Sequence, residues 1–160
     1  AFAMTGWRMG YTASSKELAS AMGKFQGQAT GCPNSIAQYA SEVALTEPPT
    51  FLDDWRAQFV ERRDYMVKAL NEMSGITCLM PEGAFYVFPK VSDLFGKKVG
   101  DVEIKNDMDL TKYLLDEAHI TIVPGAAFGA PEHVRLSYAT SLDAIKTGLG
   151  RFADAVAKLN

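Results

Sequence analysis

The segment between His133 and Leu159 constrains the fold most, because two different periodicities follow one another there. Over HVRLSYA, apolar residues alternate with polar or small ones, which predicts a strand with one apolar face. The opposite face carries Arg135, Ser137 and Ala139, and the two small side chains leave room for a ligand beside the arginine. Apolar residues then recur every three or four positions, at Ile145, Leu149, Phe152, Val156 and Leu159. Such a stripe predicts an amphipathic helix that covers a sheet.

Helix-like and strand-like segments alternate over the rest of the chain and predict an α/β fold. Apolar residues at helical spacing mark four segments: 14–25, 34–46, 50–73 and 107–118. Strand-forming runs occupy 76–80, 84–88 and 119–123, whereas 26–33 and 92–107 have the composition of loops. This order predicts a mixed or antiparallel sheet covered by helices. The prolines within 46–49 predict a boundary that divides the chain into 1–47 and 48–160.

The composition argues against several classes of protein. A net charge of -3 with balanced signs gives no electrostatic case for a nucleic acid or an anionic membrane as partner. No apolar stretch approaches the ~20 residues of a membrane-spanning helix. Cys32 and Cys78 are far apart and form no CxxC motif, which is typical of reduced cysteines in an intracellular protein. Since His119 and His133 are the only histidines, we expect no metal site.

The first eleven residues, AFAMTGWRMGY, place an arginine between two apolar runs. The runs predict two strand-like pieces on either side of a turn at Thr5 and Gly6, with Arg8 next to the turn. A guanidinium that is buried without an anionic partner costs several kcal/mol, so Arg8 should have one. Its planar fork of donors suits a phosphate or a carboxylate. The alternative is an ordinary surface arginine at a hairpin.

Three stretches resemble class I pyridoxal-phosphate aminotransferases of the bacterial-type aspartate aminotransferase branch: AFAMTGWRMGY, PEGAFYVFP and HVRLSYATS. The resemblance implies the fold-type I architecture of these enzymes and pyridoxal 5'-phosphate as cofactor. It assigns 1–47 to the end of the large cofactor-binding domain, and 48–160 to a long interdomain helix and the small domain. The lysine that forms the Schiff base with the cofactor is expected immediately before Ala1. The chain would then hold no catalytic residue and would be inactive alone.

The same resemblance implies roles for residues of this chain. Arg8 would bind the cofactor phosphate, and Arg135 would pair with the α-carboxylate of the substrate. Phe85 would lie near the substrate, although on residue type alone it is more typical of a core aromatic. The loop from Pro124 to Gly129 is rich in small residues, but it lacks a lysine and a following helix, so it is a weak signal for phosphate binding.

The implied activity is transfer of the amino group of L-aspartate, or of a similar amino acid, to 2-oxoglutarate by a cytoplasmic homodimer. Two alternatives stay open. The first is a lyase or synthase that uses the same cofactor, which the upstream residues and a substrate screen would distinguish. The second is an aminotransferase-like domain that senses an amino acid in a regulator, which an attached basic helix-turn-helix segment would favour.

Overall fold

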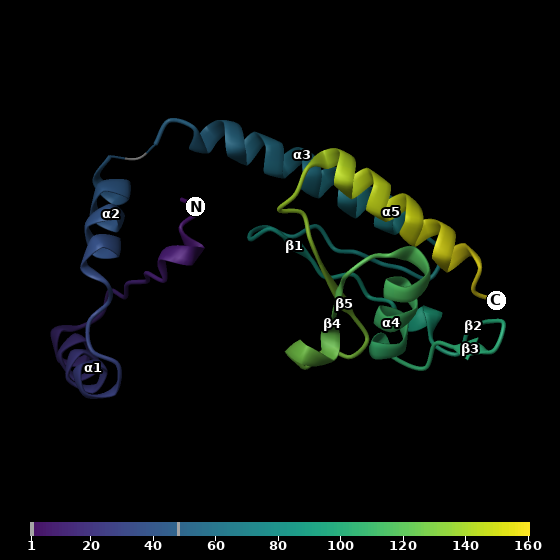
Figure 1. Ribbon diagram of the computed structural model, residues 1–160, viewed down its shortest axis with the longest axis horizontal. Helices are drawn as coiled ribbons and strands as arrows, with labels where there is room; N and C mark the ends of the chain where they lie inside the picture. The colour runs from purple at the N-terminus through teal and green to yellow at the C-terminus, as the bar shows by residue number, and fades with distance from the viewer. Residues whose placement is uncertain (1, 48) are drawn as a thin grey trace. The chain divides into compact units, whose positions relative to one another are not determined.

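The computed structural model describes residues 2–47 and 49–160, and the chain divides into two compact units (Figure 1). The first unit is Ala1–Trp55 and the second is Arg56–Asn160. Because this division falls inside a helix, it does not coincide with the expected boundary between 47 and 48, and the assignment of domains stays a prediction. Pro48, which is expected to end a helix, lies outside the described residues.

Two helices make up most of the first unit. Helix α1 is Lys16–Ala29 and α2 is Ser35–Thr46. Asn34 caps α2, because its side-chain oxygen accepts hydrogen bonds from two backbone N–H groups at the start of the helix. Helix α1 extends into the segment 26–33, contrary to the expected loop. The backbone turns away from the axis of α1 only at Gly31. The φ of Gly31 is 74°, a left-handed conformation that glycine adopts without strain.

The expectation of two strand-like runs in the first eleven residues is wrong for the described residues 2–11. Thr5–Trp7 form a short 3-10 helix, η1, and Arg8 follows it in a left-handed conformation with φ of 56°. The first described strand along the chain starts only at Tyr86. The physical reason is that an apolar run becomes a strand only when a second strand pairs with its backbone.

A three-stranded antiparallel sheet forms the centre of the second unit. Its strands lie in the order β1 (Tyr86–Val87), β5 (Val134–Ser137) and β4 (Val123–Pro124). The pairs Val87–Leu136 and Val123–Arg135 set the register. The predicted antiparallel sheet is therefore present, with shorter strands than expected.

Two segments of the second unit differ from the sequence-based expectation. Segment 76–80 contributes only a bridge between Thr77 and Lys90 in place of a strand. Segment 92–107 holds a hairpin of β2 (Lys98–Val99) and β3 (Val102–Glu103) in place of a simple loop.

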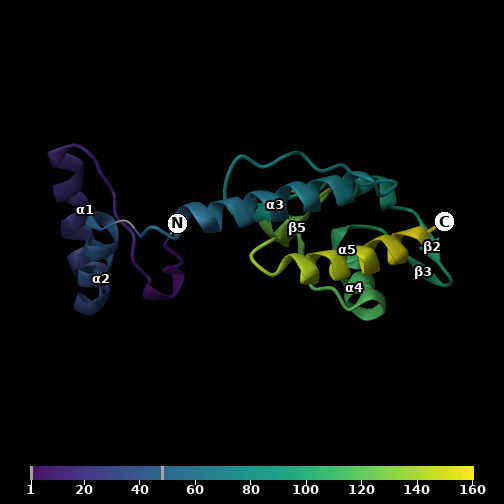
Figure 2. The same ribbon diagram turned by 90° about the horizontal axis from the view of Figure 1, so that it is seen from above.

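Three helices pack against the sheet: α3 (Leu52–Asn71), α4 (Asp107–Ala118) and α5 (Leu142–Ala157). Helices α3 and α5 lie side by side in both views (Figures 1 and 2). The predicted stripe is confirmed: four of its residues lie on α5, Leu159 lies just beyond its end, and all five are buried in one hydrophobic core. That core also takes side chains from the sheet and the other two helices, among them Val87, Val134, Leu136, Leu70 and Leu114.

Candidate active site

Arg135 lies on the central strand of the sheet and on the face opposite the core. Its neighbours Val134 and Leu136 are buried in the core. Because successive side chains of a strand point to opposite faces, Arg135 and Ser137 point away from the helices. The alternation that is visible in the sequence thus predicted this placement correctly.

Two aromatic rings contact the guanidinium of Arg135. Its central carbon, Cζ, lies 4.4 Å from the ring centre of Tyr86 and 4.5 Å from that of Phe128. Tyr86 comes from β1, and Phe128 ends a short 3-10 helix, η3 (Gly125–Phe128), that follows β4. Both distances are within the range of an attractive cation–π contact. The two rings therefore fix the position of the guanidinium.

The guanidinium of Arg135 has no acidic partner in the part of the chain that the structure describes. The ion pairs found there join other residues, and the side chain of Arg135 makes none of the hydrogen bonds found there. The residue is half-buried. A partly desolvated cation with free N–H donors is a site for an anion, and its fork of donors matches a carboxylate.

Phe85 belongs to the turn that leads into β1, and its ring lies beside that of Tyr86 with the centres 4.5 Å apart. Its other ring neighbours are Phe59 and, through Phe59, Tyr138, so the ring also packs at the edge of the core. Phe85 is thus one ring removed from Arg135. Direct contact between Phe85 and a substrate stays a prediction.

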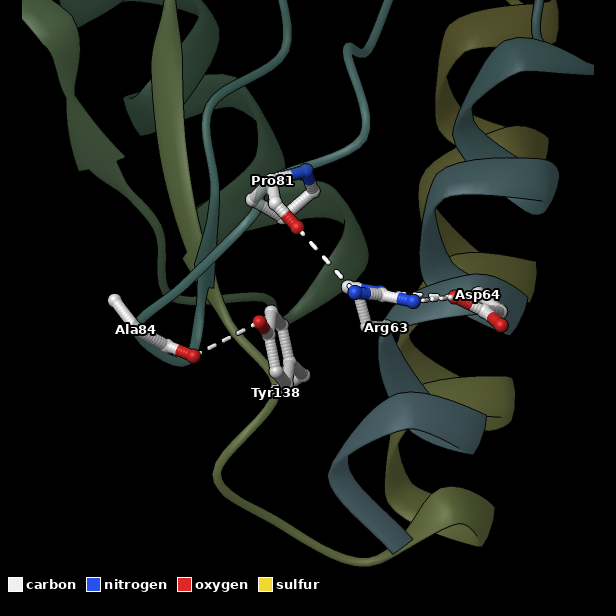
Figure 3. Close-up of polar contacts among 5 residues, drawn as sticks. All are labelled: Arg63, Asp64, Pro81, Ala84 and Tyr138. Atoms are coloured by element: carbon white, nitrogen blue, oxygen red, sulfur yellow. Dashed lines mark hydrogen bonds and ion pairs between the residues drawn. The ribbon is translucent and has the colours of Figure 1, made fainter. Parts of the chain in front are cut away.

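Tyr138 and Arg63 hold the turn that precedes β1 (Figure 3). The hydroxyl of Tyr138 donates to the carbonyl of Ala84 over 3.0 Å, and its backbone N–H donates to the carbonyl of Phe85 over 2.9 Å. Arg63, on α3, is paired with Asp64 and reaches the carbonyl of Pro81 at the long distance of 3.5 Å. These contacts hold Ala84 at a φ of 61°, which is uncommon for a residue with a side chain.

Burial raises the pKa of the Tyr138 hydroxyl; Arg63 opposes this effect and Asp64 reinforces it. Even a tyrosine of ordinary pKa is protonated at neutral pH, so the phenol can act as the donor to Ala84. Burial likewise raises the pKa of the Cys78 thiol to about 11, against a smaller lowering by a hydrogen bond with the backbone of Phe88. Cys78 is therefore a packed, protonated thiol rather than a nucleophile.

Arg8 lies in the first unit and is exposed. One of its terminal nitrogens, Nη1, donates to the carbonyl of Thr5 over 3.2 Å. The residue borders a pocket of ≈ 600 Å³ that is lined by Ala3, Gly6, Trp7, Arg8, Pro33, Asn34 and Ala37. Among the described residues, no carboxylate pairs with Arg8, and the pocket contains the first turn of α2. An arginine beside the positive end of a helix fits an anion such as a phosphate.

The predicted site residues thus fall into two groups. Arg135 and Phe85 belong to the second unit and are linked through Tyr86, whereas Arg8 belongs to the first unit. Sequence reasoning missed Phe128 as a site residue, because the GAAFG loop was considered only for phosphate binding. The available signal was a single aromatic residue in an otherwise small-residue loop next to a strand.

The described residues give no evidence for other kinds of site. These residues contain no cluster of His, Cys, Asp and Glu that could hold a metal ion. None of the described helices combines the length and apolar character that crossing a bilayer requires. A second pocket, of ≈ 550 Å³, lies between α3 and α5 and is lined by neither Arg135 nor Phe85.

Comparison with known proteins gives one consistent family. Residues 1–152 match the family described as aminotransferase class I and II. The chain is 46% identical to an aspartate aminotransferase of Rhizobium meliloti over 100% of the chain and 39% of that protein. It is also 46% identical to an aspartate/prephenate aminotransferase of Cereibacter sphaeroides, over 94% of the chain and 38% of that protein. The crystal structure of the aspartate aminotransferase from Rhizobium meliloti superimposes with a TM-score of 0.92, covering 100% of this chain and 40% of that one.

Proposed function

Because the chain belongs to the class I and II aminotransferase family, we propose that it is part of an enzyme that transfers the amino group of L-aspartate, or of a similar amino acid, to 2-oxoglutarate. Class I aminotransferases depend on pyridoxal phosphate and act on amino acids and 2-oxo acids. The chain spans about 40% of the length of the relatives reported above, so the activity is proposed for the whole protein. The observation that carries the proposal is the unpaired guanidinium of Arg135 between two aromatic rings.

Arg135 would hold the α-carboxylate of the amino acid. Two parallel N–H···O bonds from one planar group fix both the position and the tilt of a carboxylate. The rings of Tyr86 and Phe128 already restrain the guanidinium, so the fork would present its donors to the amino acid in a restricted orientation. Such prior orientation of the reacting group accounts for a large part of the rate in many enzymes.

Arg8 would hold the phosphate of the cofactor. The exposed guanidinium, which keeps N–H donors beyond the one that it gives to Thr5, and the absence of carboxylates from the pocket lining fit a dianionic group. When bound, pyridoxal phosphate supplies an aldehyde that takes up the amino group and a ring that accepts electrons. The task of this chain is to hold the phosphate with Arg8 and to orient the amino acid with Arg135.

The remaining features of the whole protein rest on the resemblance to the family. We propose that the lysine which binds the cofactor precedes Ala1 in the whole protein, and that the protein is a homodimer. A cytoplasmic location is supported by the two cysteines, Cys32 and Cys78, which are both free.

Steady-state kinetics of the whole protein test the proposed function. With pyridoxal phosphate, L-aspartate and 2-oxoglutarate, the wild type should form glutamate and oxaloacetate in equal amounts. Arg135→Gln should raise the KM for L-aspartate strongly, because the carboxylate loses its cationic partner. The matched control is Arg151→Gln, which removes an exposed arginine of α5 and should leave the kinetics unchanged. Retained binding of L-aspartate without any turnover by the wild type would refute the proposal and favour the sensor alternative.

A further inference from the structure

The two rings that contact Arg135 approach its guanidinium from different sides. Each ring centre is less than 5 Å from Cζ, at 4.4 Å for Tyr86 and 4.5 Å for Phe128. Within the described residues, Tyr86 makes its ring contact with Phe85, and Phe128 makes its ring contact with Phe88, but the two do not contact each other. Two rings so close to one atom and yet not in contact with each other lie on different sides of it. Together they limit the directions from which a ligand can reach the guanidinium.

The position of Phe128 is set by a closed loop and one buried carboxylate. The loop is closed by backbone hydrogen bonds from Gly125 to His133 over 2.9 Å and from Ala130 to Gly125 over 3.0 Å. The backbone N–H of Ala126, inside η3, donates to Oδ2 of Asp107 over 2.7 Å. Asp107 is 2% exposed and is the only charged residue buried in the described part of the chain. A charged group at that depth needs such a partner, so the bond ties η3 firmly to α4.

This arrangement narrows the space beside the guanidinium that a ligand can occupy. A carboxylate is planar and can lie in the plane of the fork, where both oxygens accept N–H bonds. A phosphonate or sulfonate is tetrahedral, so its third oxygen stands out of that plane and needs more room beside the rings. Rings on two sides of the guanidinium would therefore discriminate between anions by shape, which a lone arginine does not.

We infer that Phe128, positioned by Asp107, is a specificity-determining residue that restricts Arg135 to planar carboxylates and rejects tetrahedral anions. The inference rests on the proposed function, because it takes Arg135 to be the site of the substrate carboxylate. It deepens that function by assigning a task to two further residues, Phe128 and Asp107.

Binding of two matched ligands to the whole protein tests the inference. The ligands are L-aspartate and its analogue in which a phosphonate replaces the α-carboxylate. The cofactor is first fixed by borohydride reduction so that neither ligand reacts, and both dissociation constants are measured by calorimetry. The readout is the ratio of the two constants. A general destabilisation of the fold weakens the binding of both ligands equally and leaves this ratio unchanged.

The wild type should prefer the carboxylate, and Phe128→Leu should lower this preference roughly tenfold, the effect that one added or removed group has in a binding pocket. Asp107→Ala should lower it in the same direction, because η3 loses its tie to α4. The control Phe95→Leu changes a half-buried ring elsewhere in the second unit and should keep the wild-type ratio.

An unchanged ratio in Phe128→Leu would overturn the inference, and an unchanged ratio in Asp107→Ala alone would overturn the positioning role of Asp107. The proposed function fails in a different way. If Arg135→Gln binds L-aspartate as tightly as the wild type, then Arg135 is not the carboxylate site at all. The two failures are therefore distinguishable in one series of titrations.

Discussion

At the scale of single residues, the proposed binding of the α-carboxylate depends on the geometry of the Arg135 guanidinium rather than on its charge alone. Arg135→Lys keeps a positive charge but loses the planar fork and its stacking between Tyr86 and Phe128. We expect kcat/KM for L-aspartate to fall roughly 10- to 150-fold, which corresponds to the free energy of a hydrogen bond to a charged group. Arg135→Lys should also lower kcat, since a lysine holds the carboxylate without fixing its tilt. A variant as active as the wild type would show that charge alone suffices.

The two cysteines differ in burial, and this difference predicts their reactivity. Cys32 is exposed, whereas Cys78 is buried with a thiol pKa of about 11. A thiol of that pKa is less than about one hundredth ionised at pH 8, and only the thiolate reacts. We expect a chromogenic disulfide reagent to modify one thiol rapidly in the folded chain and two after unfolding in urea. Cys32→Ser should abolish the rapid phase. A rapid phase that survives this substitution would show that Cys78 is accessible.

At the scale of elements, the loop that carries Phe128 has no room for a side chain at Gly125. A methyl group at this position would collide with the backbone carbonyls of Ala130 and His133. We expect Gly125→Ala to lower the free energy of unfolding by about 1–3 kcal/mol, as overpacking does elsewhere. Urea denaturation of the chain, followed by circular dichroism, measures the change.

The matched control is Gly150→Ala in α5, where an added methyl group meets nothing within 4 Å. Alanine favours a helix over glycine, so this variant should gain about 0.4–1 kcal/mol. The two substitutions are chemically identical and should have opposite signs. If both destabilise the chain equally, the close packing of the η3 loop does not explain the effect.

The elements that depend on local signals were predictable from the sequence. The stripe of α5, the helical segment that became α2 and the alternation around Arg135 each depend on residues close in the chain. The segment 2–11 and the β2–β3 hairpin were mispredicted, because strand formation depends on a partner that residue type does not reveal.

The candidate site shows the same limit. Arg135 was predicted from its strand and from the resemblance, and Arg8 from its place between two apolar runs and from the resemblance. The contact of Phe128 with Arg135 joins η3 to β5 in three dimensions, and the buried bond from Asp107 to Ala126 joins two further segments. The periodicity of apolar residues in the sequence does not indicate contacts between distant segments. The contacts of Phe128 and Asp107 could therefore be identified only in the structure.

At the scale of the whole molecule, the isolated chain should lack covalent cofactor chemistry. The lysine that binds pyridoxal phosphate is proposed to lie before Ala1, and neither Lys16 nor Lys24 has the sequence context of the family's cofactor lysine. Incubation of the 160-residue chain with pyridoxal phosphate, followed by borohydride and peptide mass mapping, should give no unique adduct. The whole protein, treated in the same way, should give one. A single modified lysine within the isolated chain would contradict the proposed division of tasks.

The central claim is that the whole protein moves an amino group between two acids and that Arg135 holds the amino acid while it does so. The most direct measurement is the transfer of isotopically labelled nitrogen from L-aspartate to 2-oxoglutarate, followed by mass spectrometry of the products. The account predicts labelled glutamate in an amount equal to the oxaloacetate formed, with a sharply lower rate in Arg135→Gln. Cofactor-loaded whole protein that leaves the label in aspartate, or an Arg135→Gln variant that transfers it at the wild-type rate, would contradict the account.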